Sequence, residues 1–391
     1  MRILIFSLAY LPFIGGAELA VKEITDRISG ISAKGGPQPK ADAPLAQASD
    51  WEFDLITVNL DGKQKSVEKV GNVMVYRLGR GRMAKYFFSW QAVKKAQELN
   101  RQKNYQSIWA IMANQAGLAA LFFKKEFPQV KYVLTLQEGD SLKRIWSRTL
   151  LIRSLYKKIY QKADAITAIS NFLAKRAKKY GYQGQLSIVP NGVDLSNFKK
   201  EFELEEINGL KKQLGLESSD KVITTISRLV YKNGIDILIK AVKDLPVKVL
   251  IIGSGKLETR LNSLAQELGV RNKILFLGYI GQNNLSQYLQ LTDVFVRTSR
   301  SEGLGSAFLE AMAAGVPVIG TCVGGIPDFL KDGQTGLFVE VGNPIDLAAK
   351  IKILLTDEAL RQRLINNARS LVFQSYDWQQ IAQKMAGIFE S

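Results

Sequence analysis

The chain has 391 residues, 46% of them hydrophobic and 23% charged, a composition typical of a soluble globular protein large enough for two domains. It has no histidine, which removes the commonest general base and transition-metal ligand, and no Asp-x-Asp pair, so a metal-centred mechanism is not expected. The net charge of +17 is unevenly spread: residues 1–190 carry 30 basic and 14 acidic residues, whereas residues 191–391 carry 23 and 22.

The composition also bears on the compartment. No stretch reaches the roughly 18 apolar residues that a bilayer-crossing helix needs, and the first residues lack a cleavable signal pattern. The single cysteine, Cys322, excludes an internal disulfide, and its apolar neighbours predict a buried thiol. We therefore predict a cytoplasmic protein.

Short β-rich runs alternate with helical patterns along the chain, which is the signature of βαβ units and parallel sheets. Each half of the chain has enough predicted strands for one doubly wound domain. The strands are predicted at residues 3–6, 53–58, 108–113, 132–136 and 165–169 in the first half, and at residues 222–227, 247–253, 274–278, 294–298 and 317–321 in the second.

A Pro-Asn-Gly turn at residues 190–192 follows a short strand and predicts the boundary between the domains. We expect one Rossmann-like domain over residues 1–189, a second over residues 190–375, and a helix over residues 376–391 that packs back on the first. Residues 30–50 are rich in Gly, Pro, Ala and Gln without a periodic apolar face, which predicts a flexible insertion.

Glu302 and Glu310 frame the most informative motif, EGLGSAFLE. Its Gly-x-Gly turn opens into a helix, so the two carboxylates can project from the loop and from the first helical turn toward one spot. A helix N-terminus favours phosphate, and carboxylates accept hydrogen bonds from hydroxyls. The motif therefore indicates a sugar-nucleotide site, with a helix cap and a surface glutamate as the alternative.

Further motifs occur in order along the chain: Gly15-Gly16-Ala17-Glu18, residues 188–194, 226–239 and 302–319, Gly324-Gly325-Ile326-Pro327, and residues 332–338. Together they resemble the family 4 retaining glycosyltransferases (glycosyl transferases group 1), which have the GT-B architecture of two facing Rossmann-like domains. The resemblance implies that the first domain binds the acceptor and the second a nucleotide-sugar donor. It implies transfer of a hexosyl unit from a UDP- or GDP-sugar to a hydroxyl of a glycan or lipid-linked acceptor.

The resemblance also implies roles for residues of the second domain. Glu310 is expected to hold the ribose hydroxyls, and Arg228 to grip the pyrophosphate, where a fixed cation stabilises growing leaving-group charge. The family's usual lysine is Asn233 here, so Lys232, one residue earlier, is the candidate for the same phosphate. Surface ion pairing is the alternative for both cations. Glu302 and the backbone of Gly303, Leu304, Gly305 and Ser306 are expected to hold the transferred sugar and the phosphates. Gly278, Tyr279 and Ile280 are expected to contact the base.

In the first domain, Gly15 and Gly16 follow the first strand and can bring bare backbone close to the donor phosphate and the acceptor. Many relatives place a histidine after the strand at residues 132–136, whereas this chain has Gln137, Glu138 and Asp140 as acceptor-side candidates. A simple turn explains these residues about equally well.

The missing histidine also shapes the expected mechanism. No motif identifies both a nucleophile and an acid–base group, as double displacement would need. The resemblance implies a same-face substitution in which the departing phosphate helps to deprotonate the attacking hydroxyl. The protein would supply orientation and charge stabilisation. No cofactor and no metal are expected.

The basic excess of the first half gathers in segments that also carry apolar residues. Seven basic residues and no acidic one occur between Asp140 and Asp164, in an amphipathic helical pattern, and residues 175–179 and 80–88 form two more basic clusters. We predict that this domain meets an anionic membrane surface, at the inner face of the cell membrane. For each segment, a helix that packs its apolar face on the sheet is the alternative.

Two other functions compete with this interpretation. A GT-B sugar-nucleotide epimerase or phosphorylase is the nearer one. A nucleic-acid-binding protein is the rival from another class, but the basic segments match no known nucleic-acid module, so no nucleic-acid partner is expected.

Overall fold

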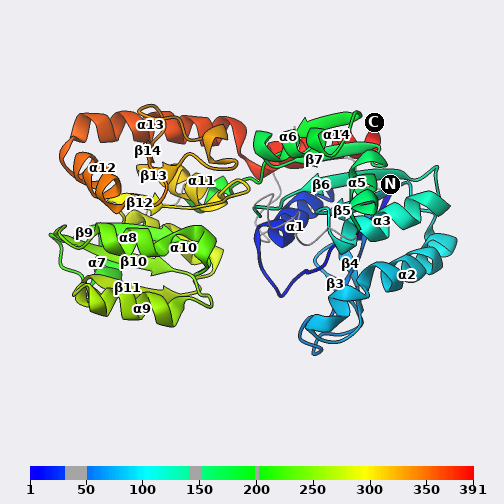
Figure 1. Ribbon diagram of the computed structural model, residues 1–391, viewed down its shortest axis with the longest axis horizontal. Helices are drawn as coiled ribbons and strands as arrows, with labels where there is room; N and C mark the ends of the chain where they lie inside the picture. Colours follow the sequence, from blue (N-terminus) through cyan, green and yellow to red (C-terminus); the bar gives the residue numbers. More distant parts are fainter. Residues whose placement is uncertain (31–50, 141–151, 199–201) are drawn as a thin grey trace. The chain divides into compact units, whose positions relative to one another are not determined.

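The computed structural model describes residues 1–30, 51–140, 152–198 and 202–391. The chain forms two compact units, Met1–Asn191 together with Trp378–Ser391, and Gly192–Asp377. Each unit is a doubly wound α/β domain (Figure 1). Most of the predicted insertion, and the basic residues Lys143, Arg144 and Arg148, lie outside the described residues.

Within the described residues, the first unit holds an eight-stranded sheet of order β3-β4-β2-β1-β5-β6-β7-β8. All neighbouring strands are parallel except the β3–β4 pair. The strands are β1 (Arg2–Phe6), β2 (Glu52–Val58), β3 (Val67–Val70), β4 (Val73–Leu78), β5 (Ser107–Ile111), β6 (Lys131–Leu136), β7 (Ala165–Ala168) and β8 (Gln185–Ile188).

Helices cover both faces of this sheet because its strands are apolar on both sides. Ile3 and Ile5 share a core with α1 and α14, and the ring of Trp109 on β5 meets that of Phe389 edge-on. On the other face, Phe6 lies beside Phe123 of α3. The helices are α1 (Gly16–Ile28), α2 (Phe88–Lys103), α3 (Gln115–Glu126), α5 (Arg153–Gln161), α6 (Asn171–Lys179) and α14 (Trp378–Glu390), with a 3-10 turn η1 (Arg82–Tyr86).

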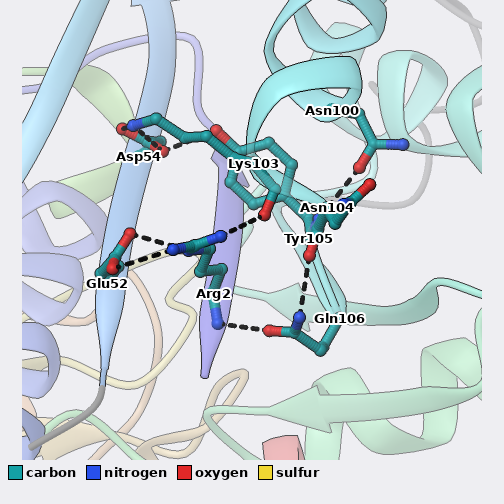
Figure 2. Close-up of polar contacts among 8 residues, drawn as sticks. All are labelled: Arg2, Glu52, Asp54, Asn100, Lys103, Asn104, Tyr105 and Gln106. Carbon is teal, nitrogen blue, oxygen red and sulfur yellow. Dashed lines mark hydrogen bonds and ion pairs between the residues drawn. The ribbon is translucent and has the colours of Figure 1, made fainter.

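A polar network ties the end of α2 to the amino-terminal ends of β1 and β2 (Figure 2). The buried carboxylate of Asp54 accepts hydrogen bonds from Lys103 Nζ, at 2.7 and 2.9 Å, and from the Tyr105 hydroxyl at 2.6 Å. Arg2 Nε pairs with Glu52 at 2.9 Å, and its Nη1 donates to the Lys103 carbonyl. The carboxyl-terminal edge of the sheet is thereby left for the loops that carry the site candidates.

In its described residues, the second unit holds a six-stranded parallel sheet of order β11-β10-β9-β12-β13-β14. Its order reverses between β9 and β12, the point at which such sheets bind ligands beyond the carboxyl ends of the strands. The strands are β9 (Lys221–Ile226), β10 (Val247–Ile252), β11 (Ile274–Gly278), β12 (Val294–Arg297), β13 (Val318–Thr321) and β14 (Leu337–Val339). The helices are α7 (Leu204–Gln213), α8 (Ile235–Ala241), α9 (Glu258–Glu267), α10 (Gln282–Gln290), α11 (Ser306–Ala313), α12 (Pro344–Thr356) and α13 (Glu358–Ser375).

All ten predicted strands are present, and β8 is the short strand expected before the Pro-Asn-Gly turn, but β3, β4 and β14 were not predicted. The prediction of a buried Cys322 thiol was wrong: the side chain is exposed, because the residue directly follows β13 and begins the loop beyond the sheet. Among the helices of the described ranges, none has the length and apolar character needed to span a bilayer.

Candidate functional site

Glu302 lies in the loop between β12 and α11, where its carboxylate is held on both oxygens. Oε2 accepts a hydrogen bond from Nη2 of Arg297, the last residue of β12, and Oε1 accepts one from the Gly303 backbone N–H at 3.0 Å. Both side chains of this ion pair are only 11% exposed. The carboxylate is therefore fixed beyond the carboxyl end of β12, beside the switch point of the sheet.

Glu310 is the fifth residue of α11, so it lies in the second helical turn. The prediction that it lies in the first turn was wrong. The reason is that the helix begins as early as Ser306, directly after Gly305. Its carboxylate is buried and accepts a hydrogen bond from Gln282 Nε2 at 3.1 Å. Burial raises the pKa of Glu310, although the Gln282 bond and the charge of Arg297 act to lower it. Arg297 therefore acts on both carboxylates.

The loop that carries Glu302 is shaped by close packing against the loop after β13. Gly324 has φ +59°, and a Cβ atom at this position would lie 1.8 Å from the Glu302 carbonyl oxygen. The Thr321 hydroxyl donates to the Ser299 carbonyl at 2.6 Å. Gly305 caps α11 with φ +96°. Gly303, Leu304 and Gly305 are buried, whereas Ser306 at the start of α11 is half-buried.

A pair of glycine substitutions tests this packing. Gly333→Ala, at φ +66° with open space around the position, should lower the free energy of unfolding of the second unit by about 1 kcal/mol. Gly324→Ala should cost about 3 kcal/mol or more, because Glu302 must also move. Urea unfolding of the two variants measures the difference. An equal decrease in the free energy of unfolding would show that the Glu302 loop can move to admit the Cβ atom without further destabilisation.

Arg228 is exposed, two residues after β9, in a loop held by its backbone. Asn233 Nδ2 donates to the Arg228 carbonyl at 2.7 Å, and the Leu229 N–H donates to the Ser254 carbonyl at 3.0 Å. Asn233 is buried, so the residue at the family's lysine position supports the loop. Lys232 is half-buried, and its carbonyl accepts the Arg300 N–H at 2.7 Å.

Gly278, Tyr279 and Ile280 lead from the end of β11 into α10. The Gly278 carbonyl accepts the Gly253 N–H at 2.6 Å, and the Tyr279 side chain is 63% exposed. Gln282 follows in the same segment and reaches Glu310. The segment predicted to meet the base is thus joined through one side chain to the Glu302–Glu310 pair.

In the first unit, Gly15 and Gly16 are exposed where β1 gives way to α1. Asn191 Nδ2 lies 3.4 Å from both the Gly16 carbonyl and Gln137 Oε1. The structure therefore brings Gly16, Gln137 and Asn191 together at the carboxyl edge of this sheet.

Glu138 and Asp140 are tied to the protein backbone. The Glu138 carboxylate accepts a hydrogen bond from the Ala113 N–H, and Arg176 donates to the carbonyls of Glu138 and Asp140 at 3.3 and 2.8 Å. Burial raises the pKa of the Glu138 carboxyl, against a lowering by Arg176. The Glu138 carboxylate is turned inward and supports the turn after β5.

Three site residues were not predicted in these roles: Arg297, Gln282 and Asn191. Arg297 could have been found, because a charged residue at the carboxyl end of an apolar strand is a signal of function in parallel sheets. Gln282 and Asn191 give no such signal, since an amide near a helix start or in a turn is common.

Comparison with known proteins agrees with this geometry. Residues 206–371 match the family described as Glycosyl transferases group 1, and residues 45–197 match Glycosyltransferase Family 4. The chain is 30% identical, over 308 residues, to the GDP-mannose-dependent monoacylated alpha-(1-6)-phosphatidylinositol monomannoside mannosyltransferase of Corynebacterium glutamicum; this covers 75% of the chain and 78% of that protein. It is 27% identical over 300 residues to the N-acetyl-alpha-D-glucosaminyl L-malate synthase of Bacillus anthracis, covering 75% and 77%.

Solved structures show the same fold. The sucrose-phosphate synthase of Thermosynechococcus elongatus matches with a TM-score of 0.82 and 21% identity, covering 100% of this chain and 98% of that one. Anabaena HepE, in complex with UDP and glucose, matches with a TM-score of 0.79 and 20% identity, covering 100% and 99%. The predicted GT-B fold is confirmed.

Proposed function

Because this chain is a glycosyltransferase that belongs to family 4, we propose that it moves a hexosyl unit, with retention, from a UDP- or GDP-sugar to a hydroxyl of a glycan or lipid-linked acceptor. The observation that carries the proposal is the buried pair Glu302 and Glu310, both acted on by Arg297, beyond the carboxyl end of β12. The reversal of strand order there favours a nucleotide site.

The proposed donor site uses the second unit. Glu310 accepts the ribose hydroxyls, and Glu302 with the backbone of Gly303 and Ser306 holds the sugar and phosphates. Arg228 and the longer-reaching Lys232 stabilise the charge that grows on the departing diphosphate. The relative from C. glutamicum is GDP-mannose-dependent and HepE binds UDP, which keeps both donors in the proposal.

The proposed acceptor side uses the first unit, where Gln137 and Asn191 meet the β1–α1 loop. Gln137 cannot exchange a proton at neutral pH, so it orients a hydroxyl. The departing phosphate then takes the proton as the hydroxyl attacks from the same face. The mechanism uses no metal and no cofactor, which follows the absence of histidine and of Asp-x-Asp from the sequence.

Thermal-shift measurements with UDP, GDP, ADP and their sugars test donor binding, because a ligand at 100 times its Kd stabilises by about 2.7 kcal/mol. A shift with UDP or GDP is expected. Release of nucleoside diphosphate only when an acceptor is present would separate transfer from epimerisation and phosphorolysis. An α-linked product from an α-linked donor, seen by NMR, would establish retention; inversion would contradict the mechanism.

The raised pKa of Glu310 predicts an unusual acid limit for donor binding. Only the carboxylate accepts two hydroxyl bonds, so the donor should weaken as the pH falls through the raised pKa, beginning above the ordinary value of 4.5. Titrating the Kd of the nucleoside diphosphate between pH 4 and 8 measures this, and Glu310→Gln should lack that acid limb. If the loss of affinity at low pH is the same in Glu310→Gln as in the wild type, another titrating group causes it.

A further inference from the structure

A cluster of large apolar side chains is exposed at the start of α2. Met83, Tyr86, Phe87 and Trp90 are 68%, 59%, 64% and 62% exposed, within eight residues. Large exposed apolar patches mark interaction sites, because soluble proteins rarely leave them uncovered. We call these four residues, with the basic residues around them, the η1–α2 surface.

The η1–α2 surface is strongly basic. No acidic residue occurs between Glu68 and Glu98, and Arg80, Arg82, Lys85 and Lys94 are all exposed. Lys94 Nζ lies 3.8 Å from the centre of the Trp90 ring, and Lys85 Nζ lies 5.2 Å from that of Tyr86. The cations and the aromatic rings therefore occupy the same face.

The protein holds this surface in a fixed shape. Phe88 and Ala92 are fully buried and anchor the first turns of α2, while the Gly81 N–H donates to the Asn59 carbonyl at 2.8 Å. The far end of α2 is tied down by Lys103 in the network of Figure 2. The aromatic side chains are thus exposed although the backbone beneath them is well packed.

The other basic segments of this unit do not offer such a surface in their described parts. Tyr156, Ile159 and Tyr160 turn the apolar face of α5 into the protein, and α6 buries Leu173 and Ala177. For these two helices the ordinary explanation of their amphipathic pattern is correct. The cluster at residues 80–90 differs because Tyr86, Phe87 and Trp90 remain exposed.

We propose that the η1–α2 surface docks the enzyme on an anionic phospholipid membrane. Trp and Tyr favour the headgroup level of a bilayer, Met and Phe can enter the acyl boundary, and Lys and Arg attract anionic lipid. A protein partner or a second copy would have to bring acidic groups that match these cations in position, whereas an anionic bilayer presents negative charge along its whole surface.

The η1–α2 surface also lies close to the candidate acceptor side. It follows β4, whose carboxyl end lies at the same sheet edge as that of β1, two strands away. Arg77 Nη2, on β4, donates to the Leu11 carbonyl at 2.6 Å, in the loop that leads to Gly15. A docked membrane would present a lipid-linked acceptor at this edge; only this consequence rests on the proposed function.

Flotation with lipid vesicles tests the docking. The full chain should float with equimolar phosphatidylcholine and phosphatidylglycerol, and about tenfold less with phosphatidylcholine alone or at high salt. Phe87→Ser with Trp90→Ser should reduce anionic binding tenfold or more. Leu204→Ser with Ile345→Ser, which removes two exposed apolar residues of the second unit, should leave it unchanged.

Each outcome decides the proposal. The proposal would be overturned if the wild type failed to float with anionic vesicles at any salt concentration. It would also be overturned if the Phe87/Trp90 variant floated as well as the wild type. If the wild type self-associated but did not bind vesicles, and the Phe87/Trp90 variant no longer self-associated, the surface would be a contact between two copies of the chain and the proposal would be overturned. Nucleoside-diphosphate binding measured on the same samples confirms folding and tests the proposed function separately, so that the two can fail independently.

Discussion

Replacing Arg228 by alanine should lower kcat/KM about 100- to 1000-fold, the loss expected when one fixed group that stabilises transition-state charge is removed. The loop that presents the guanidinium is held by Asn233 and Ser254 through its backbone, so the truncation removes charge without disturbing these bonds. Most of the loss should appear in kcat, because the diphosphate gains charge as the glycosidic bond breaks.

Two further variants give this prediction its controls. Arg228→Lys should lose less than alanine but should not restore full activity, since an ammonium group lacks the planar fork that meets phosphate in two places. Arg363→Ala, which removes an exposed arginine from α13 of the same unit, should have no effect. Steady-state kinetics with the donor identified by thermal shift provides the numbers. Wild-type kcat/KM in Arg228→Ala would remove the residue from the mechanism.

Replacing Glu310 by alanine should weaken binding of the nucleoside diphosphate about 10- to 100-fold. Its carboxylate is already buried and oriented by Gln282, so it accepts ribose hydroxyls without paying for new ordering. Hydrogen bonds to a charged group contribute about 1.5–3 kcal/mol. Calorimetric titration of wild type and variant with UDP and GDP measures the change.

The controls for Glu310 separate charge from shape. Glu310→Gln keeps the size of the side chain and should fall between wild type and alanine. Glu267→Ala, at an exposed position at the end of α9, should bind as wild type does. Unchanged affinity in Glu310→Ala would mean that the ribose is held elsewhere.

The fold and the main motif could be predicted because their signals are local. Alternation of apolar strands with helices defines a parallel sheet, and a Gly-x-Gly turn before an apolar run defines a loop that opens into α11. Two of the missed strands have weak local signals: β3 is a four-residue, partly polar edge strand and β14 has three residues. The third, β4 (VMVYRL), is β-rich over six residues and was overlooked although its signal is local. The position of Glu310 was wrong by one helical turn because helix starts depend on cap geometry, here Gly305.

The rest of the site could not be predicted because it depends on contacts between distant segments. Arg297, at the end of β12, and Glu302, in the loop that follows, are close in sequence. In contrast, Gln282 reaches Glu310 from another helix, and Gly324 packs on Glu302 from the loop after another strand. Asn233 was noted only as a departure from the family's lysine. The hydrogen bond from Asn233 to the Arg228 carbonyl shows that this asparagine supports the loop that carries Arg228.

Hydrogen–deuterium exchange with and without UDP or GDP tests the central claim most directly, namely that the donor binds beyond the carboxyl ends of β9 and β12. The account predicts that saturating nucleotide slows exchange in peptides spanning residues 226–235 and 297–313, and that Glu310→Ala loses this protection. Protection confined to the first unit, or none at nucleotide concentrations that saturate binding, would contradict it.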